Sequence, residues 1–374
     1  MAEIIDTPAL LLDRDRLDNN ILRMRDKLTQ FNVTLRPHVK TNKCLEVTKR
    51  LFADGRGPIT VSTLREADFF LAAGFTDILY SVGISPNKFA HAARLIENGA
   101  DLKLVLDNLE CACLLADFSR SRGQSFEVLL EIDCDGHRSG IVPQSTLLVE
   151  IANLFRDSGV RVSGVMTHAG NSYNSRSIAD IEAYALQERA AVIEAARLLN
   201  DAGFELSIIS IGSTPTALFT HDLSGITEVR AGVFAFFDLV MAGLGVCNVQ
   251  DIAISVLATV IGHQTEKGWT MVDAGWMALS RDRGTVQQYV DQGYGIVCDL
   301  SGQPIGDLIV TAANQEHGII SSRSGRLESV PVLPIGTQLR ILPNHACATA
   351  AQHAGYHVLT EGRHLDYWPR ISGW

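Results

Sequence analysis

The sequence lacks several features that mark whole classes of protein. Basic residues are outnumbered: 32 Lys and Arg stand against 42 Asp and Glu in 374 residues, a formal net charge of −10 at pH 7. This balance argues against nucleic acid or an anionic membrane surface as a partner, since sequence-independent binding to either needs basic patches. No uninterrupted apolar run approaches the roughly 20 residues of a membrane span. We therefore expect neither a nucleic-acid nor a membrane partner.

Disulfide and zinc-finger patterns are also missing. The seven cysteines are an odd, scattered set, and the spacing of Cys111 and Cys113 is wrong for the usual zinc or redox pairs. The segment 1–6 is acidic and short, so it does not resemble a secretory leader. These observations predict reduced thiols and a cytoplasmic location.

What the sequence does contain, from residue 33 to about residue 230, is a regular alternation of short β-rich runs and longer segments of helical period. Eight such units in about 200 residues predict an α/β fold, a (β/α)8 barrel. A doubly wound sheet is the alternative, but the Gly-rich turn that usually follows its first strand is absent. The expected strands are 33–40, 59–62, 77–82, 102–107, 127–133, 160–168, 206–211 and 227–230.

The character of the sequence changes near residue 245. Alternating β-runs follow, with turns at Lys267-Gly268 and Ser324-Gly325 and few helix signals. We predict a barrel domain over residues 15–244 and a mainly β domain over residues 245–374, which residues 1–14 join as an extra strand. The β-runs are 253–263, 270–273, 308–313, 338–342 and 356–360.

One lysine stands out at the end of the first expected strand, in the run RPHVKTNK. Side chains alternate along a strand, so Arg36, His38 and Lys40 would share one face. Strands of an α/β fold are covered on both faces, and buried cationic side chains need an anionic or reactive partner. Lys40 is therefore a candidate Schiff-base former, because burial and a cationic neighbour lower the pKa of a lysine. A surface ion pair with a nearby glutamate explains the run equally well.

A second candidate site lies in the β domain, in the run Pro343-Asn344-His345-Ala346-Cys347. If this run is a strand, His345 and Cys347 point the same way. Imidazole and thiolate form a soft pair suited to zinc, and two protein ligands leave positions open for water or substrate, as in catalytic sites. A buried cysteine beside an unrelated histidine is the alternative.

Polar motifs also follow the later barrel strands, where barrel chemistry gathers. Gly212-Ser213-Thr214 follows the seventh strand and precedes a helix, an arrangement that suits a phosphate or, alternatively, a plain helix cap. Arg230, on the eighth strand, would point inward or pair with Glu228, and Gly232 permits close approach of a ligand. His168, after the sixth strand, is a candidate for stacking on a ring or a satisfied core histidine.

Two more groups belong to these loops. Arg138, after the fifth strand, is a candidate anion clamp, although a solvated turn explains it as well. Tyr173 lies in the small-residue loop that begins at His168.

Together these motifs resemble one family. The ordered set PHVKTNK, THAGNSY, GSTPT, EVRAG, DAG with ALS, and PNHAC is similar to fold-type III pyridoxal-phosphate enzymes, related to alanine racemase, of the D-threonine aldolase and D-serine dehydratase branch. The resemblance spans nearly the whole chain. It implies a pyridoxal 5′-phosphate cofactor bound covalently by Lys40 and a homodimer. The other cofactor-binding residues that it implies are Arg138, His168, Tyr173, Gly212, Ser213, Thr214, Arg230, Gly232 and Val233.

Within that branch, the resemblance assigns a divalent metal to His345 and Cys347, with zinc favoured and manganese or magnesium as alternatives. A cysteine at the second position is typical of the dehydratases and an aspartate of the aldolases. The expected reaction is therefore β-elimination from a D-β-hydroxy amino acid such as D-serine, giving a 2-oxo acid and ammonia. The alternatives are a D-threonine or D-3-hydroxyaspartate aldolase and, more remotely, a racemase or a non-catalytic carrier of the cofactor.

Overall fold

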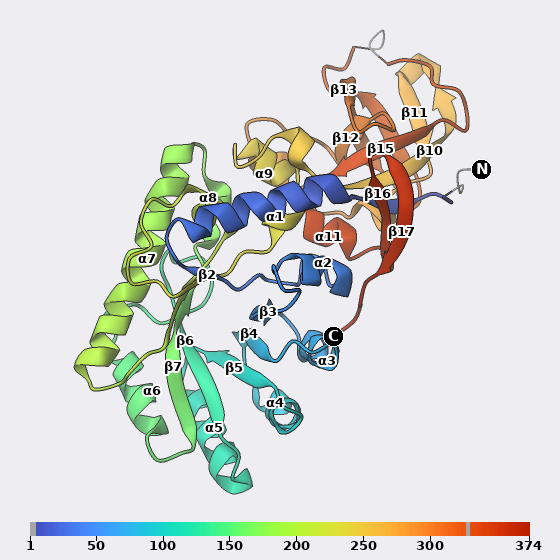
Figure 1. Cartoon of the computed structure of the whole chain (residues 1–374). Coiled ribbons are helices and arrows are strands. Elements are labelled where there is room, and N and C mark those ends of the chain that lie inside the picture. Colours follow the sequence, from blue (N-terminus) through green and yellow to red (C-terminus); the bar gives the residue numbers. More distant parts are fainter. Residues whose placement is uncertain (1–4, 327–329) are drawn as a thin grey trace. The chain divides into compact units, whose positions relative to one another are not determined.

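The computed structural model describes residues 5–326 and 330–374, without the side chain of residue 365. It divides into two compact units (Figure 1). The barrel unit contains Met24–Gly232 with Gly373–Trp374, and the β-rich unit contains Met1–Arg23 with Val233–Ser372. The boundary at residues 23 and 24 falls inside helix α1 (Arg14–Thr29). Residues 1–4 of the expected N-terminal strand lie outside the described residues.

The barrel unit holds one parallel sheet of eight strands in the order β2-β9-β8-β7-β6-β5-β4-β3. A parallel bridge between His38 and Thr60 joins the continuation of β2 to β3, so the order closes on itself. The predicted (β/α)8 barrel followed by a mainly β region is confirmed. The strands are β2 (Thr34–Leu35), β3 (Ile59–Val61), β4 (Asp77–Gly83), β5 (Asp101–Leu106), β6 (Phe126–Ile132), β7 (Val160–Thr167), β8 (Ile208–Ile211) and β9 (Glu228–Val229).

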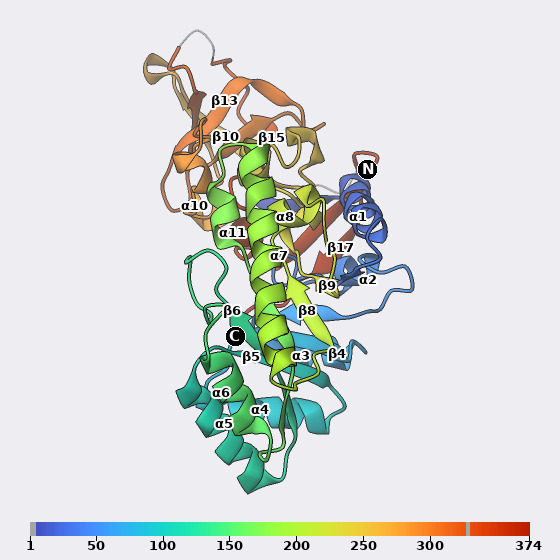
Figure 2. The same ribbon diagram turned by 90° about the vertical axis from the view of Figure 1, so that its left-hand side faces the viewer.

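Helices between these strands cover the outside of the sheet, and Figure 2 shows the longest, α7, beside β8. The same helix also contacts β7. Side chains cap the N-terminal ends of several of these helices. The Thr63 hydroxyl accepts from Glu66 N, and Ser177 and Asp180 form a reciprocal cap at the start of α7. The helices are α2 (Leu45–Arg50), α3 (Leu64–Ala72), α4 (Pro86–Glu97), α5 (Leu109–Arg122), α6 (Leu147–Phe155), α7 (Ile178–Asp201) and α8 (Thr214–Phe219), with the 3-10 turn η1 (Gly170–Asn174).

The barrel interior is layered along its strands. On β4 the inward positions are Asp77, Leu79 and Ser81, because side chains on one face recur every second residue. Leu79 packs with Val105, Leu129 and Met166 of the next three strands, and this apolar layer is almost fully buried. The layer separates charged residues near the starts of the strands from polar residues near their C-terminal ends.

The β-rich unit is built on a nine-stranded sheet in the order β11-β14-β13-β12-β15-β10-β1-β16-β17. An additional pairing of β10 with β11 closes six of the strands into a ring. β1 pairs antiparallel with β10 and parallel with β16. The strands are β1 (Ala9–Asp13), β10 (Ile254–Gln264), β11 (Trp269–Val272), β12 (Gly295–Cys298), β13 (Pro304–Ala313), β14 (Gly318–Ser322), β15 (Gln338–Pro343), β16 (Gly355–Thr360) and β17 (Arg363–Pro369).

Short helices connect these strands. They are α9 (Leu239–Gly243), α10 (Trp276–Leu279) and α11 (Ala346–Ala350), with 3-10 turns η2 (Val233–Ala235), η3 (Val249–Asp251), η4 (Thr265–Lys267) and η5 (Gly284–Gln287). In the part of the chain that the structure describes, no helix combines the length and apolar character needed to cross a membrane.

Candidate cofactor and metal sites

Lys40 follows the first barrel strand in a turn, not in the strand itself. Val39 N donates to Thr60 O at 2.9 Å, and the turn begins there. Lys40 is exposed, whereas Arg36 is buried. The prediction that a buried strand face surrounds the lysine was therefore wrong. The regular strand ends early because Pro37 has no N–H to offer the ladder and the chain turns immediately afterwards.

His38 lies between this turn and the ends of β3 and β4. Its Nε2 is 3.3 Å from Ser62 Oγ and 3.2 Å from Ser81 Oγ, and Lys40 N is 3.5 Å from its Nδ1. Burial, together with the charges of Lys40 and Arg230, holds the pKa of His38 well below its usual value. The ring is therefore neutral.

His168, at the end of β7, is neutral for the same reasons. Burial, together with the positive charges of Lys40, Arg138 and Arg230, lowers the pKa of His168 to about 3, against the opposing effect of a hydrogen bond to Gly212 O. His168 Nδ1 lies 2.5 Å from that carbonyl oxygen, which only accepts. Nδ1 thus carries the proton and Nε2 the lone pair. Tyr173 follows in η1, and its ring centroid is 6.0 Å from that of His168.

Arg230, immediately after β9, is buried and held by the barrel. Its guanidinium donates to Ser210 Oγ and, at 2.5 Å, to Thr167 O. Of the two alternatives predicted for Arg230, the inward orientation is observed and the direct pair with Glu228 is not, because the Ser210 hydroxyl lies between them and donates to Glu228 Oε1 at 2.7 Å.

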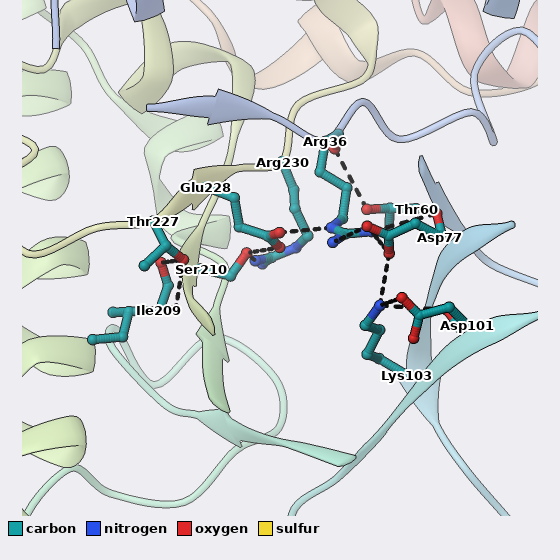
Figure 3. Close-up of polar contacts among 10 residues, drawn as sticks. All are labelled: Arg36, Thr60, Asp77, Asp101, Lys103, Ile209, Ser210, Thr227, Glu228 and Arg230. Carbon is teal, nitrogen blue, oxygen red and sulfur yellow. Dashed lines mark hydrogen bonds and ion pairs between the residues drawn. The ribbon is translucent and has the colours of Figure 1, made fainter. Parts of the chain in front are cut away.

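Glu228 belongs to a continuous charged network in the barrel (Figure 3). Arg36 Nε donates to Glu228 Oε2 at 2.7 Å, and Arg36 Nη1 donates to Asp77 Oδ1 at the same distance. Lys103 Nζ donates to Asp77 Oδ1 at 2.8 Å and reaches Asp101 at 2.5 Å. Buried charges are tolerated only when they are paired in this way.

The loop after β8 is held by a buried carboxylate on α7. Glu188 Oε1 accepts from Gly212 N and from Ala169 N, both at 3.0 Å, and Oε2 accepts from the Thr216 hydroxyl at 2.6 Å. Both backbone polar groups of Gly212 are thus engaged within the protein. A side chain at Gly212 is excluded, because its Cβ would lie 1.7 Å from Arg230 O.

Hydroxyl groups surround Ser213, which follows Gly212. Ser213 Oγ lies 2.9 Å from both Ser172 Oγ and Thr216 Oγ1, and it accepts from Thr216 N at 3.2 Å. Thr214 is buried beside it. The loops after β7 and β8 therefore bring the predicted residues His168, Ser213 and Thr214 into one region of the barrel unit.

The remaining predicted cofactor residues are less closely grouped. Gly232 lies against the Lys40 turn, where an added Cβ would be 2.7 Å from His38 O and 2.9 Å from Thr41 Oγ1. Val233 opens η2 as the first residue of the second segment of the β-rich unit. The Arg138 side chain is 59% exposed and lies 3.5 Å from the buried Glu131, so a solvent-exposed loop carries it.

In the β-rich unit, the predicted metal ligands occur at a helix start. β15 ends at Pro343, His345 is the N-cap of α11, and Cys347 lies in its first turn. The strand geometry predicted for this pair was wrong, yet the two side chains meet, because His345 hydrogen-bonds Cys347. Among the described residues, no group of three or more His, Cys, Asp and Glu side chains is arranged to hold a metal ion.

Two aspartates support this pair. Asp282 Oδ2 lies 2.6 Å from His345 Nδ1, and the buried Asp238 accepts from Ala346 N at 2.9 Å while capping α9 through Met241 N. Burial disfavours a charged ring at His345, but Asp282 and Cys347 outweigh it and raise the pKa of His345 to about 11. The position therefore favours a positive charge.

Sequence reasoning missed both Glu188 and Asp282. Glu188 had a detectable signal, because it occupies a position in the buried stripe of α7, where apolar residues recur every three or four positions. A charged residue in such a stripe needs buried partners. Asp282 gave no comparable signal, since it lies in an irregular segment after α10.

Comparisons with known proteins agree with this arrangement. Residues 12–240 match the family described as alanine racemase, N-terminal domain, and residues 253–359 match the serine dehydratase domain. The chain is 50% identical over 373 residues to D-threo-3-hydroxyaspartate dehydratase of Delftia sp. (strain HT23), covering 99% of this chain and 98% of that protein. The solved structure of that dehydratase superimposes with a TM-score of 0.97, covering 99% of this chain and 98% of the other.

Two further similarities are more distant. D-serine dehydratase of Dictyostelium discoideum is 32% identical over 381 residues, covering 96% of this chain and 95% of that protein. The structure of D-threonine aldolase from Filomicrobium marinum shares the fold at a TM-score of 0.81 and 24% identity, covering 98% of this chain and 95% of the other. This chain belongs to the alanine racemase N-terminal domain family, in the fold-type III pyridoxal-phosphate branch that includes D-3-hydroxyaspartate dehydratase, D-serine dehydratase and D-threonine aldolase.

Proposed function

We propose that this chain is a lyase that depends on pyridoxal phosphate and a divalent metal and acts on D-β-hydroxy amino acids. The reaction is β-elimination, in which the β-hydroxyl leaves and the final products are a 2-oxo acid and ammonia. D-threo-3-hydroxyaspartate is the first candidate substrate, because the dehydratase named for it is 50% identical over nearly the full length. D-serine is the second, from the 32% identical relative.

The observation that carries the proposal is a concentration of positive charge around a neutral histidine. Lys40, Arg138 and Arg230 all lie near enough to depress the pKa of His168. A phosphate dianion and a substrate carboxylate would balance these charges. The residues of the barrel unit therefore fit a phosphorylated, aldehyde-bearing cofactor that a lysine can bind covalently.

When bound, pyridoxal phosphate supplies an electron sink for a carbanion at Cα. Lys40 Nζ would bind the cofactor and remove the α-proton. Burial lowers the pKa of Arg230, against the opposing charges of Glu228, Glu188 and Glu131. Its guanidinium would face the pyridine nitrogen as a donor and keep that nitrogen unprotonated. His168 would present its flat neutral ring to the cofactor, and Ser213 with Thr214 would bind the phosphate.

His345 and Cys347 fit a metal through the chemistry of their donor atoms. Asp282 engages His345 Nδ1, which leaves Nε2 for a metal, and carboxylate partners of this kind orient metal-binding histidines. A thiolate and an imidazole favour zinc, with manganese or magnesium as alternatives. A bound cation would act as a Lewis acid toward the β-hydroxyl.

Two solved variants of a D-threo-3-hydroxyaspartate dehydratase support this assignment. One has a histidine replaced by alanine, and another has a cysteine replaced by alanine and is described as metal-free. The two replaced residues are two positions apart, as His345 and Cys347 are.

The test is product analysis of purified protein loaded with pyridoxal phosphate. D-threo-3-hydroxyaspartate, D-serine and D-threonine are each supplied with EDTA, zinc, manganese or magnesium. Ammonia and a 2-oxo acid that disappear with EDTA support the proposal, and Cys347→Ala is expected to lose metal and turnover together. Turnover that is independent of metal, or inversion at Cα, refutes it.

The same assay decides an alternative reaction. The aldolase in the comparison shares the fold, so cleavage of Cα–Cβ in D-threonine or D-3-hydroxyaspartate remains the second candidate. Glycine with an aldehyde would identify it. We further propose a homodimer, to be tested by the mass of the native particle in light scattering, and a cytoplasmic location, which the seven free cysteines support.

A further inference from the structure

We propose that Glu188 is a positioning residue that fixes His168 in its Nδ1-protonated form and holds the loops after β7 and β8 in the geometry that binds the cofactor. The inference deepens the proposed function and rests on it for the identity of the cofactor. The position of the histidine proton can be tested without any cofactor.

The contacts of one carboxylate oxygen carry the argument. Ala169 N belongs to the peptide that follows His168, and Gly212 N belongs to the residue whose carbonyl accepts the His168 proton. Glu188 Oε1 binds both N–H groups at 3.0 Å. This oxygen therefore fixes the distance between the backbone next to His168 and the backbone of Gly212, whose carbonyl accepts the His168 proton.

The second oxygen extends the same control to the loop hydroxyls. Glu188 Oε2 takes the only proton of the Thr216 hydroxyl, so toward Ser213 the Thr216 oxygen acts only as an acceptor. Ser172 donates its proton to Ala169 O at 2.7 Å. Ser213 therefore donates its own proton to the Ser172 or the Thr216 oxygen, each 2.9 Å away, and among these three hydroxyls it is the one whose proton is not held by a carbonyl or a carboxylate and can turn toward an anion.

A packing role alone does not explain this residue. Glu188 is fully buried in the apolar stripe of α7, where alanine or leucine would complete the packing without a desolvated charge. Burial raises the pKa of its carboxyl, while hydrogen bonds from Thr216, Ala169 and Gly212 and the charge of Arg230 oppose that rise. Each donor therefore stabilises an ionised carboxylate. Without the carboxylate, two buried N–H groups lose their partner.

The decisive variant is Glu188→Gln, which keeps the size of the side chain. An amide oxygen can still accept from the two N–H groups but without charge assistance, and the amide nitrogen faces the Thr216 hydroxyl as a donor. The Thr216 proton is then turned back toward Ser213. Glu182→Gln on the same helix is the matched control, because Glu182 is partly exposed and contacts His221.

Two quantities are measured on each variant. Nitrogen-15 chemical shifts of labelled histidine report the tautomer of His168 in cofactor-free protein, and titration with pyridoxal phosphate gives its dissociation constant. We expect Glu188→Gln to show a mixture of His168 tautomers and about tenfold weaker cofactor binding, corresponding to loss of one charge-assisted hydrogen bond. Glu182→Gln is expected to match the parent protein in both.

The outcomes separate the inference from the function on which it rests. A Glu188→Gln protein with an unchanged His168 tautomer and cofactor affinity within about twofold of the parent overturns the inference. If the parent protein does not bind pyridoxal phosphate, the proposed function fails, while the tautomer comparison still decides the role of Glu188. Glu188→Ala, which removes both oxygens, should show a larger change in the same direction, but the isosteric variant decides if it does not fold.

Discussion

The charged network of the barrel and the His345–Cys347 pair of the β-rich unit differ in how deeply their charged groups are buried and in how many oppositely charged partners they have. In the barrel, Arg36 is 4% exposed and has carboxylates on two sides. In the β-rich unit, the His345 side chain is 39% exposed and, among the described residues, contacts a single carboxylate, that of Asp282, which is itself 46% exposed. The protein neutralises the first group by itself. Under the proposed function, a bound metal would complete the second group.

The largest effect is expected from Arg36→Met in the barrel. The change leaves Glu228 and Asp77 without their shared cation, and breaking a buried pair in this way costs about 3–5 kcal/mol. The measurement is urea denaturation. Arg161→Met is the matched control, because Arg161 is mostly exposed and pairs with Glu127, so it should cost at most about 1 kcal/mol. Equal losses of stability in Arg36→Met and Arg161→Met would contradict the expectation that the buried ion pairs contribute more than the exposed one.

A smaller effect, confined to ligand binding, is expected from Asp282→Asn in the β-rich unit. The amide no longer holds His345 Nδ1 by a charged hydrogen bond, so zinc affinity should fall about 10–100-fold while the free energy of unfolding changes little. Competition with a chromogenic chelator measures the affinity. Asp299→Asn, which removes a carboxylate that caps its own turn at Ser301, should leave zinc affinity unchanged. Zinc binding of Asp282→Asn equal to the parent would show that this carboxylate does not orient His345.

Ser210→Ala sharpens the comparison inside the barrel. The Ser210 hydroxyl connects Arg230 to Glu228, and its loss removes one acceptor from a buried guanidinium. We expect a loss of stability of about 1–2 kcal/mol and weaker binding of pyridoxal phosphate. Ser121→Ala, which removes an exposed helix hydroxyl, is the control for both measurements. A stability loss without any change in cofactor affinity would limit Ser210 to a structural role.

The smallest effect is a dependence of stability on pH. Burial disfavours the Asp77 carboxylate, but Arg36 and Lys103 outweigh burial and lower the pKa of Asp77 below its usual value. Its folded pKa is below its unfolded pKa, so its contribution is present above about pH 4 and is lost as the pH falls through the folded value. Between pH 5 and pH 3, the thermal midpoint of Asp77→Asn should fall less than that of the parent. Parallel curves would exclude the contribution.

Much of the barrel could be predicted because its signals are local. All eight expected barrel strands correspond to observed strands, since β-rich runs and helical periods reflect burial that recurs along each element. In the β-rich unit the strands β12, β14 and β17 were not anticipated. They are short or begin next to turns, and their pairing is antiparallel with partners that the sequence pattern does not identify.

In the candidate site, too, local features could be predicted from the sequence and long-range partners could not. Lys40, His168 and Ser213 were proposed because each follows a recognisable strand, and His345 and Cys347 because an imidazole and a thiolate two positions apart suit a metal. Partners could not be found in this way. The sequence places Glu228 beside Arg230, but the structure pairs Glu228 with Arg36, 192 residues away. The alternation of side chains along the strand points both Glu228 and Arg230 inward. The closure of the barrel then decides which residues of other strands they contact.

The sequence by itself determined the order of elements, the families to which its segments belong, and the kinds of donor atoms available for a cofactor and a metal. Only the tertiary structure decided how charge is arranged among them. It left Lys40 in an exposed turn, buried Glu188 under two loops, and brought Asp282 to His345. Those outcomes depend on contacts between residues far apart in the chain, and no local pattern of hydrophobicity records such contacts.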